Sequence, residues 1–204
     1  MFKNLFNKNQ STDNSGSTEK SGLSPGLKAL VEKAPLQIMT HELFMHYMSD
    51  NLKDDPNDPS WQNQALFFWT KDEPFEKKSL PADFESYPKH FFIFNQLPPD
   101  LKLTAGKVIP WYGMPGQGTK YFISYQGNPV PIKLLIEKGV IKKVDLIYLT
   151  ENNSAVLLDR QNYFFIMDQK RLQFKEGKFI HNNVDILFSE AFEKGLLTLV
   201  KITN

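Results

Sequence analysis

The residues with the greatest potential for chemistry lie in the stretch IPWYGMPGQGTKYF, residues 109–122. Its glycines permit positive φ angles and a close approach of the backbone to a ligand, and successive N–H groups in such a loop can bind an anion. The glycine order matches neither the Rossmann fingerprint nor the phosphate loop of nucleoside triphosphatases. A tight turn between two strands explains the same residues, so the pattern alone leaves both interpretations open.

Other candidate constellations are weaker. The segment HELFMH (41–46) resembles a zinc-protease helix, but its two histidines are five positions apart, whereas two ligands on one helical face need a spacing of four. DDPNDP (54–59) lacks the alternating ligands of a calcium loop, and no G-x-S-x-G nucleophile elbow occurs. A group of carboxylates in a proline-punctuated loop is expected to be solvated: Glu73, Glu76, Asp83 and Glu85. We therefore expect no metal site.

Composition excludes several classes of function. The 204 residues carry 24 Lys and Arg against 23 Asp and Glu, so the near-zero net charge argues against a nucleic-acid partner. The absence of Cys excludes disulfides and thiolate chemistry. No signal-peptide apolar region and no run of membrane-spanning length are visible, which predicts a cytoplasmic protein or export by a signal-less secretion system.

The elements that must position these residues predict an α+β fold in four parts. Residues 1–25 read as a disordered tail and linker, and residues 26–60 as a helical segment divided by Pro35. Residues 61–150 read as a small twisted antiparallel sheet with short helices, because aromatic and β-branched runs alternate there with turn residues. Residues 151–204 read as a β-rich extension that ends in a helix and a strand.

Four consecutive segments between about residues 64 and 146 resemble the TNT domain, the family named for the tuberculosis necrotizing toxin. They are DEPFEKKSLP (72–81), the aromatic strand KHFFIF (89–94), the block GKVIPWYGMPGQGTKY (106–121) and the helix and strand LLIEKGVIKKV (134–144). The resemblance implies a bacterial, toxin-related NAD(P) glycohydrolase, which cleaves the bond between nicotinamide and ribose. NAD or NADP would then be the substrate, with no separate cofactor.

The resemblance also implies the site. Gln117, Lys120 and His90 take the catalytic positions. The substrate-binding positions are Lys78, Trp111, Tyr112, Gly113, Gly116, Gly118 and Tyr121. On residue type alone, Trp111 and Tyr112 are expected in the core, and His90 is expected to be a structural residue at a strand end.

Several positions depart from the family pattern. The family has glutamines where Met114 and Lys120 stand, an arginine where Lys78 stands, and a glycine where Gln117 stands. A lysine cannot reproduce the bidentate grip of arginine on a phosphate. The alternative is therefore a catalytically silent module that binds a nucleotide or a protein, such as a cognate toxin, an immunity protein or a secretion component.

Overall fold

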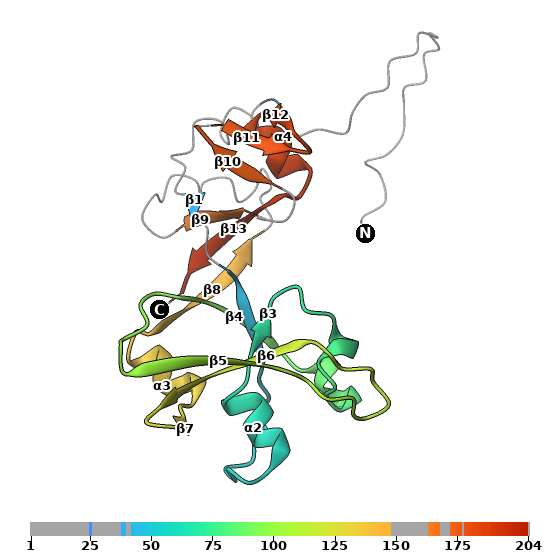
Figure 1. The fold of residues 1–204 in the computed structure, drawn as a ribbon, viewed down its shortest axis with the longest axis vertical. Coiled ribbons are helices and arrows are strands. Elements are labelled where there is room, and N and C mark those ends of the chain that lie inside the picture. The colour runs from blue at the N-terminus through green and yellow to red at the C-terminus, as the bar shows by residue number, and fades with distance from the viewer. Residues whose placement is uncertain are drawn as a thin grey trace, which may run out of the picture.

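The computed structural model describes residues 25, 38–39, 42–147, 163–167, 172–176 and 178–203. Its largest element is a seven-stranded sheet with the strand order β1-β9-β13-β8-β4-β2-β3. The strands are β1 (Ile38–Met39), β9 (Tyr163–Met167), β13 (Leu197–Ile202), β8 (Ile141–Ile147), β4 (Lys89–Phe94), β2 (Phe44–Tyr47) and β3 (Trp69–Thr70). All neighbours are antiparallel except β1 and β9. Figure 1 shows β8 and β13 leading from one half of the molecule to the other.

The helical segment expected over residues 26–60 is wrong at residues 38–39 and 44–47, which form strands. Residues 44–47 form strand β2, whose four side chains are all buried because β2 lies between β3 and β4. The apolar residues fit a helical spacing, but a short buried run of this kind has the same composition as a central strand. The helix expected over residues 26–34 and the disordered tail expected over residues 1–25 lie outside the described residues, apart from residue 25.

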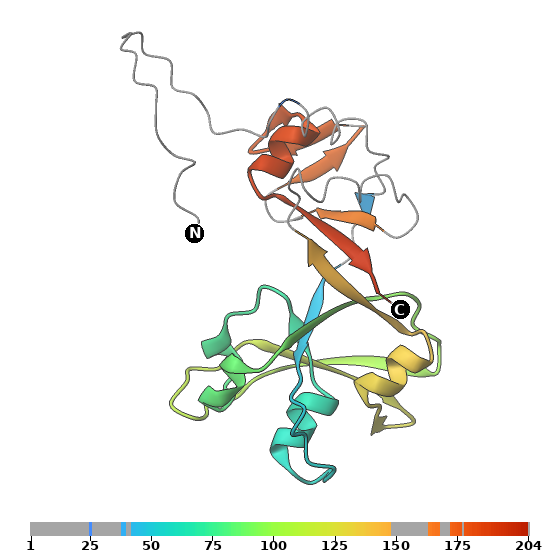
Figure 2. The same ribbon diagram turned by 180° about the vertical axis from the view of Figure 1, so that it is seen from behind.

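A second, three-stranded sheet crosses the first. It has the order β5-β6-β7, with β5 (Leu101–Lys107), β6 (Thr119–Tyr125) and β7 (Asn128–Pro129). In Figures 1 and 2 the β5–β6 hairpin runs across the direction of β4 and β2. The backbones of Phe68 and Tyr121 exchange two hydrogen bonds, of 3.0 and 2.9 Å, and this bridge ties β6 to the residues just before β3.

An aromatic core fills the space between the two sheets. Phe44 of β2 and Phe92 of β4 are stacked at 5.8 Å, and Phe68 contacts Phe44 edge to face at 5.3 Å. Helix α3 (Ile132–Glu137) closes this core with Ile132 and Leu135. Gly139 follows it at a φ of 67°, which ends the helix, so LLIEKGVIKKV contains a helix and a strand as expected.

Helix α2 (Pro59–Ala65) begins at the last proline of the segment DDPNDP. Asp58 caps it by accepting a hydrogen bond from the Ser60 amide at 2.7 Å, and Pro59 occupies the first helical position, where a missing N–H costs nothing. Two 3-10 turns follow strand β3, η1 (Phe75–Lys77) and η2 (Ala82–Ser86).

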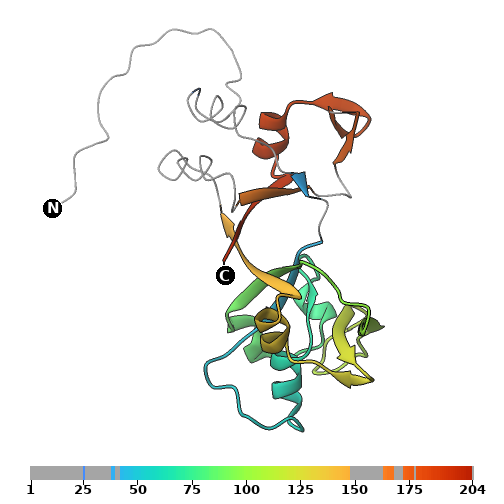
Figure 3. The same ribbon diagram turned by 90° about the vertical axis from the view of Figure 1, so that its left-hand side faces the viewer.

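The C-terminal segment adds strands to the same large sheet, because β13 pairs with both β8 and β9. It also forms a three-stranded sheet of β10 (Gln173–Lys175), β11 (Lys178–His181) and β12 (Val184–Ile186), followed by α4 (Phe188–Glu193). Figure 3 shows this small sheet and α4 on the far side of β9 and β13 from the β5–β6 hairpin. None of the helices in the described ranges has the length and apolar character needed to cross a membrane.

Candidate functional site

The glycine-rich segment is a loop that connects β5 to β6 and is fixed at its base. The Val108 amide donates to the Gly118 carbonyl at 2.9 Å, and the Gln117 amide donates to the Val108 carbonyl at 2.8 Å. The tip is a tight turn in which the Met114 amide donates to the Trp111 carbonyl at 2.9 Å. The loop therefore has a definite backbone conformation before any ligand binds.

Two glycines allow this loop to contact the η1 turn. The Gly116 and Gly118 amides donate to the carbonyls of Glu76 and Lys77, at 3.3 and 3.0 Å. A Cβ atom at Gly118 would lie 2.5 Å from the Lys77 carbonyl oxygen, and one at Gly116 would lie 2.8 Å from that of Val108. Only glycine permits these approaches, so both residues have a structural role in the loop.

Trp111 and Tyr112 lie at the tip of the loop and are exposed, which corrects the expectation that they belong to the core. Their side chains are 60% and 50% exposed, and their rings stack on each other at 5.5 Å with an interplanar angle of 22°. Tyr112 and Gly113 both have positive φ angles, of 51° and 73°, as a tight turn of the I′ type requires. The turn thus directs two aromatic rings into solvent rather than into the core.

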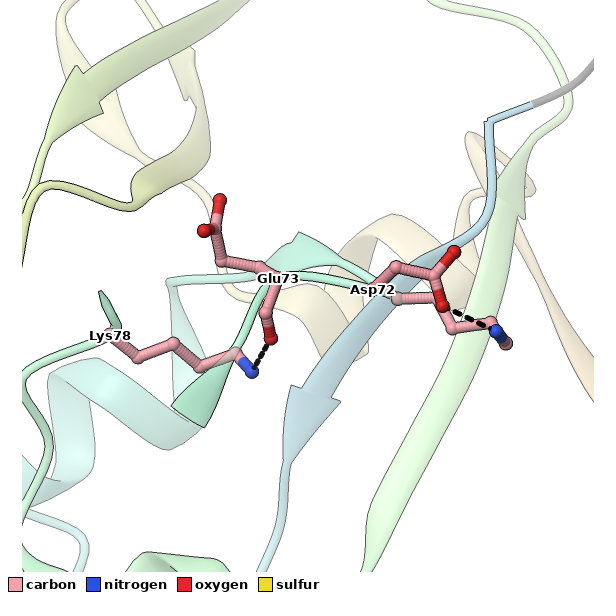
Figure 4. A network of polar contacts seen from close by, with 4 residues as sticks. Asp72, Glu73 and Lys78 are labelled. Carbon is pink, nitrogen blue, oxygen red and sulfur yellow. Dashed lines mark hydrogen bonds and ion pairs between the residues drawn. The ribbon is translucent and has the colours of Figure 1, made fainter. Parts of the chain in front are cut away.

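Glu73 joins the loop to the segment that precedes it. Its carboxylate accepts a hydrogen bond from the Thr119 amide at 3.0 Å, and its carbonyl accepts one from the Lys78 ammonium. Figure 4 shows Lys78 directed at that carbonyl, while the Glu73 carboxylate points the opposite way. The expectation of a solvated Glu73 is therefore wrong, because the carboxylate is half-buried and binds the start of β6.

Lys78 is buried beneath the loop base. It is 4% exposed, and its Nζ lies 5.7 Å from the centre of the Tyr47 ring. Burial lowers the Lys78 pKa to about 8, an effect opposed by the negative charge of Glu73 and reinforced by Lys89. Nothing in the sequence marks this lysine as buried, since lysines are almost never fully buried without a partner.

Lys120 and Tyr121 are neighbours on β6 and point to opposite faces of the hairpin. Lys120 places its Nζ 4.0 Å from the centre of the Phe67 ring, and burial lowers its pKa. Tyr121 stacks on Phe68 at 5.8 Å and packs against the aromatic core. The alternation of side chains along a strand therefore separates these two predicted site residues.

His90 lies apart from the loop, on β4 opposite His46 of β2. The two imidazole rings meet edge to face at 5.4 Å. Burial lowers the pKa of both, that of His46 to about 4. His90 also lines a groove of about 600 Å³ that contains residues of β4 and β8 and Thr203, which follows β13, but none of the glycine loop.

The structure thus forms one constellation from the loop, Glu73 and Lys78, and places His90 in another. Gln117 is exposed in the loop at a φ of 69°, between the two glycines that contact the η1 region. Within the described ranges, no group of three or more His, Asp or Glu side chains is arranged to hold a metal ion.

The fold and the site define a class of small α+β domains, in which two sheets cross and backbone hydrogen bonds hold a glycine loop. The family described as Tuberculosis necrotizing toxin, TNT, matches residues 62–144. Residues 62–144 therefore form a TNT-family domain, which contains the glycine loop and Glu73, Lys78 and His90.

Comparison with solved structures finds the tuberculosis necrotizing toxin complexed with its immunity factor, at 18% identity and a TM-score of 0.40. The similarity covers 50% of this chain and 47% of the toxin chain, so this chain spans about half of its length. No curated protein matches the chain.

Proposed function

We propose that the TNT-family domain is a glycohydrolase that cleaves the bond between nicotinamide and ribose in NAD or NADP. The observation that carries the proposal is the loop at residues 109–118. Backbone hydrogen bonds and two tightly packed glycines hold it in place, and it presents the stacked rings of Trp111 and Tyr112 to solvent. A planar base of the dinucleotide can stack on such a pair.

Hydrolysis of the bond between nicotinamide and ribose needs few catalytic groups from the protein. The oxygen of a water forms a bond to C1′ of the ribose as the bond from C1′ to the nicotinamide nitrogen breaks, and the electron pair neutralises the pyridinium charge. Nicotinamide therefore leaves as a neutral molecule that needs no proton, and the water releases its proton. The site must orient the dinucleotide and stabilise positive charge on the ribose, which are tasks of positioning and electrostatics.

In this proposal each residue has a distinct role. The side-chain amide of Gln117 orients the attacking water or the ribose, and the Lys120 ammonium binds the pyrophosphate. Lys78 and Glu73 act as positioning residues, because the Lys78 ammonium binds the Glu73 carbonyl and the Glu73 carboxylate binds the Thr119 amide at the start of β6. The domain carries no arginine, since Arg160 and Arg171 lie outside residues 62–144, and the proposal therefore assigns the phosphates to a lysine.

Turnover of 1,N6-etheno-NAD by the purified full chain tests the proposal, because loss of nicotinamide is followed by an increase in fluorescence. Gln117→Asn and Lys120→Ala should each lower kcat/KM by about tenfold or more, in line with the removal of an oriented polar group. Gln126→Asn and Lys102→Ala are matched controls. Gln126 also has a positive φ in an exposed turn, and Lys102 lies on β5 of the same hairpin.

No turnover at high protein concentration would contradict the glycohydrolase function and leave a binding module as the alternative. Turnover that is insensitive to Gln117 and Lys120 but lost in His90→Asn would move the active site to the groove beside β4.

A further inference from the structure

The large sheet contains a gap between the ends of two neighbouring strands. β4 pairs with β8 only from Phe91 opposite Val144 to Phe94 opposite Ile141. Lys89 and His90 remain in β4 through their pairing with β2. β8 continues beyond Val144 to Ile147, and there it pairs with β13 on its other edge. The edge of β8 that faces β4 is therefore without a paired strand over residues 145–147, among the parts of the chain that the structure describes.

The chain before β4 follows β2 and not β8. The Pro88 carbonyl accepts a hydrogen bond from the Met48 amide at 3.0 Å, so residue 88 extends the contact between β4 and β2.

The groove of about 600 Å³ occupies this gap. Five consecutive residues of β8 line it, residues 143–147, and consecutive residues of a strand point to opposite faces of a sheet. The groove therefore opens in the plane of the sheet, where a further strand would lie, rather than over one face. Its volume lies within the usual range for sites that bind a ligand.

The charged side chains that line the groove are mostly cationic. Lys89 and Lys143 stand at its sides with His90, and Asp145 is the one carboxylate among the lining residues. Lys89 and Asp145 are exposed, and Lys143 is half-buried. An anionic occupant is favoured because two ammonium groups face a single carboxylate.

We propose that this gap binds an extended acidic peptide, which adds a strand to β8 along Asp145–Ile147. Main-chain hydrogen bonds to the open strand edge would supply affinity, and carboxylates of the peptide would contact Lys89 and Lys143. The site lies outside the glycine loop, and His90 is the one predicted catalytic residue within it. The inference does not rest on the proposed glycohydrolase function.

Fluorescence anisotropy of labelled peptides tests this with the full chain. The probe is a hexapeptide of alternating Glu and Val, and the comparisons are the Lys and Val counterpart and an acidic peptide N-methylated at alternate residues. We expect binding of the first only, weakened by salt, together with slower hydrogen exchange at the Leu146 amide, because the N–H groups of Asp145 and Ile147 point toward β13. Equal binding of the N-methylated peptide would overturn strand addition.

A charge-reversed variant tests the specificity. Lys89→Glu combined with Lys143→Glu should lower the affinity for the acidic peptide by at least about tenfold. The same variant should bind the basic peptide, because both changes reverse charges at the groove. Lys102→Glu combined with Lys133→Glu makes the same change of net charge on β5 and α3 and should leave binding unchanged. Equal loss in both double variants would overturn the site.

Competition with a dinucleotide separates this site from the proposed active site. Excess NAD should not displace the acidic peptide from the wild-type chain. Displacement would place the dinucleotide in the gap and overturn the assignment of the gap to a peptide. Failure of the glycohydrolase assay leaves the peptide measurement unaffected.

Discussion

His46 should make the fold sensitive to acid. Its side chain is 4% exposed, and its Nδ1 has no hydrogen-bond partner. Burial lowers its pKa from 6.5 to about 4, and the neighbouring His90 and Lys143 act in the same direction. The backbone groups of Tyr47 and Gln64 act in the opposite direction without cancelling the shift in pKa.

The direction of the effect follows from proton linkage. In the unfolded chain His46 binds a proton at a pH near 6.5, whereas in the folded chain it does so only near 4. Between these values the unfolded state binds more protons, so the free energy of unfolding falls as the pH falls. One pKa unit corresponds to about 1.4 kcal/mol, and the full shift therefore corresponds to about 3 kcal/mol lost by pH 4.

Urea unfolding at a series of pH values measures this term. His46→Phe replaces the imidazole with an apolar ring that does not titrate, beside Phe92 and His90. Between about pH 7 and pH 4 the free energy of unfolding of the variant should fall by about 3 kcal/mol less than that of the wild type, whatever its stability at neutral pH. His181→Phe changes a histidine of β11, in a different sheet, and should follow the wild type.

Parallel pH profiles for the wild type and His46→Phe would refute the reasoning. They would mean that His46 is protonated in the folded chain or that its burial is relieved before unfolding.

Three further predictions concern the loop, its base and helix α2. Gly118→Ala should destabilise the fold by on the order of 2 kcal/mol in urea unfolding, because its Cβ would meet the Lys77 carbonyl, whereas Gly106→Ala, with nothing within 4 Å, should stay within about 0.5 kcal/mol of the wild type. The free energy of unfolding of the wild type should rise between about pH 8 and 10.5, because Lys78 then binds more protons in the unfolded chain than in the folded chain. Lys78→Met should show a smaller rise, and an identical rise would contradict the low pKa of Lys78. Asp58→Ala should lower the free energy of unfolding by about 1 kcal/mol by removing the cap of α2, and an unchanged urea midpoint would show that the cap does not contribute.

The sequence predicted the strands best where aromatic runs lie between turn residues. The aromatic and β-branched runs of residues 61–150 include KHFFIF, which is β4, KYFISY, which lies within β6, and IKKVDLI, which is β8. The sequence failed at β2, because an apolar segment buried on both faces loses the alternation that identifies a strand. The order of strands in the large sheet also could not be read from local patterns, since β8 joins β4 to β13 across residues far apart in the chain.

The candidate site was predicted in part. The glycine loop was found from its composition, and its turn geometry matches its residues at Tyr112 and Gly113. The burial of Lys78 and the hydrogen bond of Glu73 to Thr119 depend on contacts between segments, which residue types do not encode. The outward orientation of Trp111 was missed because hydrophobic character predicts burial, although a turn at positive φ directs the ring outward here.

The position of β8 has a consequence for biosynthesis. Its first half pairs with β4, which precedes it in the chain, and its second half pairs with β13, which is made about fifty residues later. During translation the TNT-family domain can form before β13 is available to pair with the second half of β8. The nascent protein therefore exposes an unpaired strand edge until residues 197–202 emerge, and a chaperone that binds extended segments would bind there in that interval.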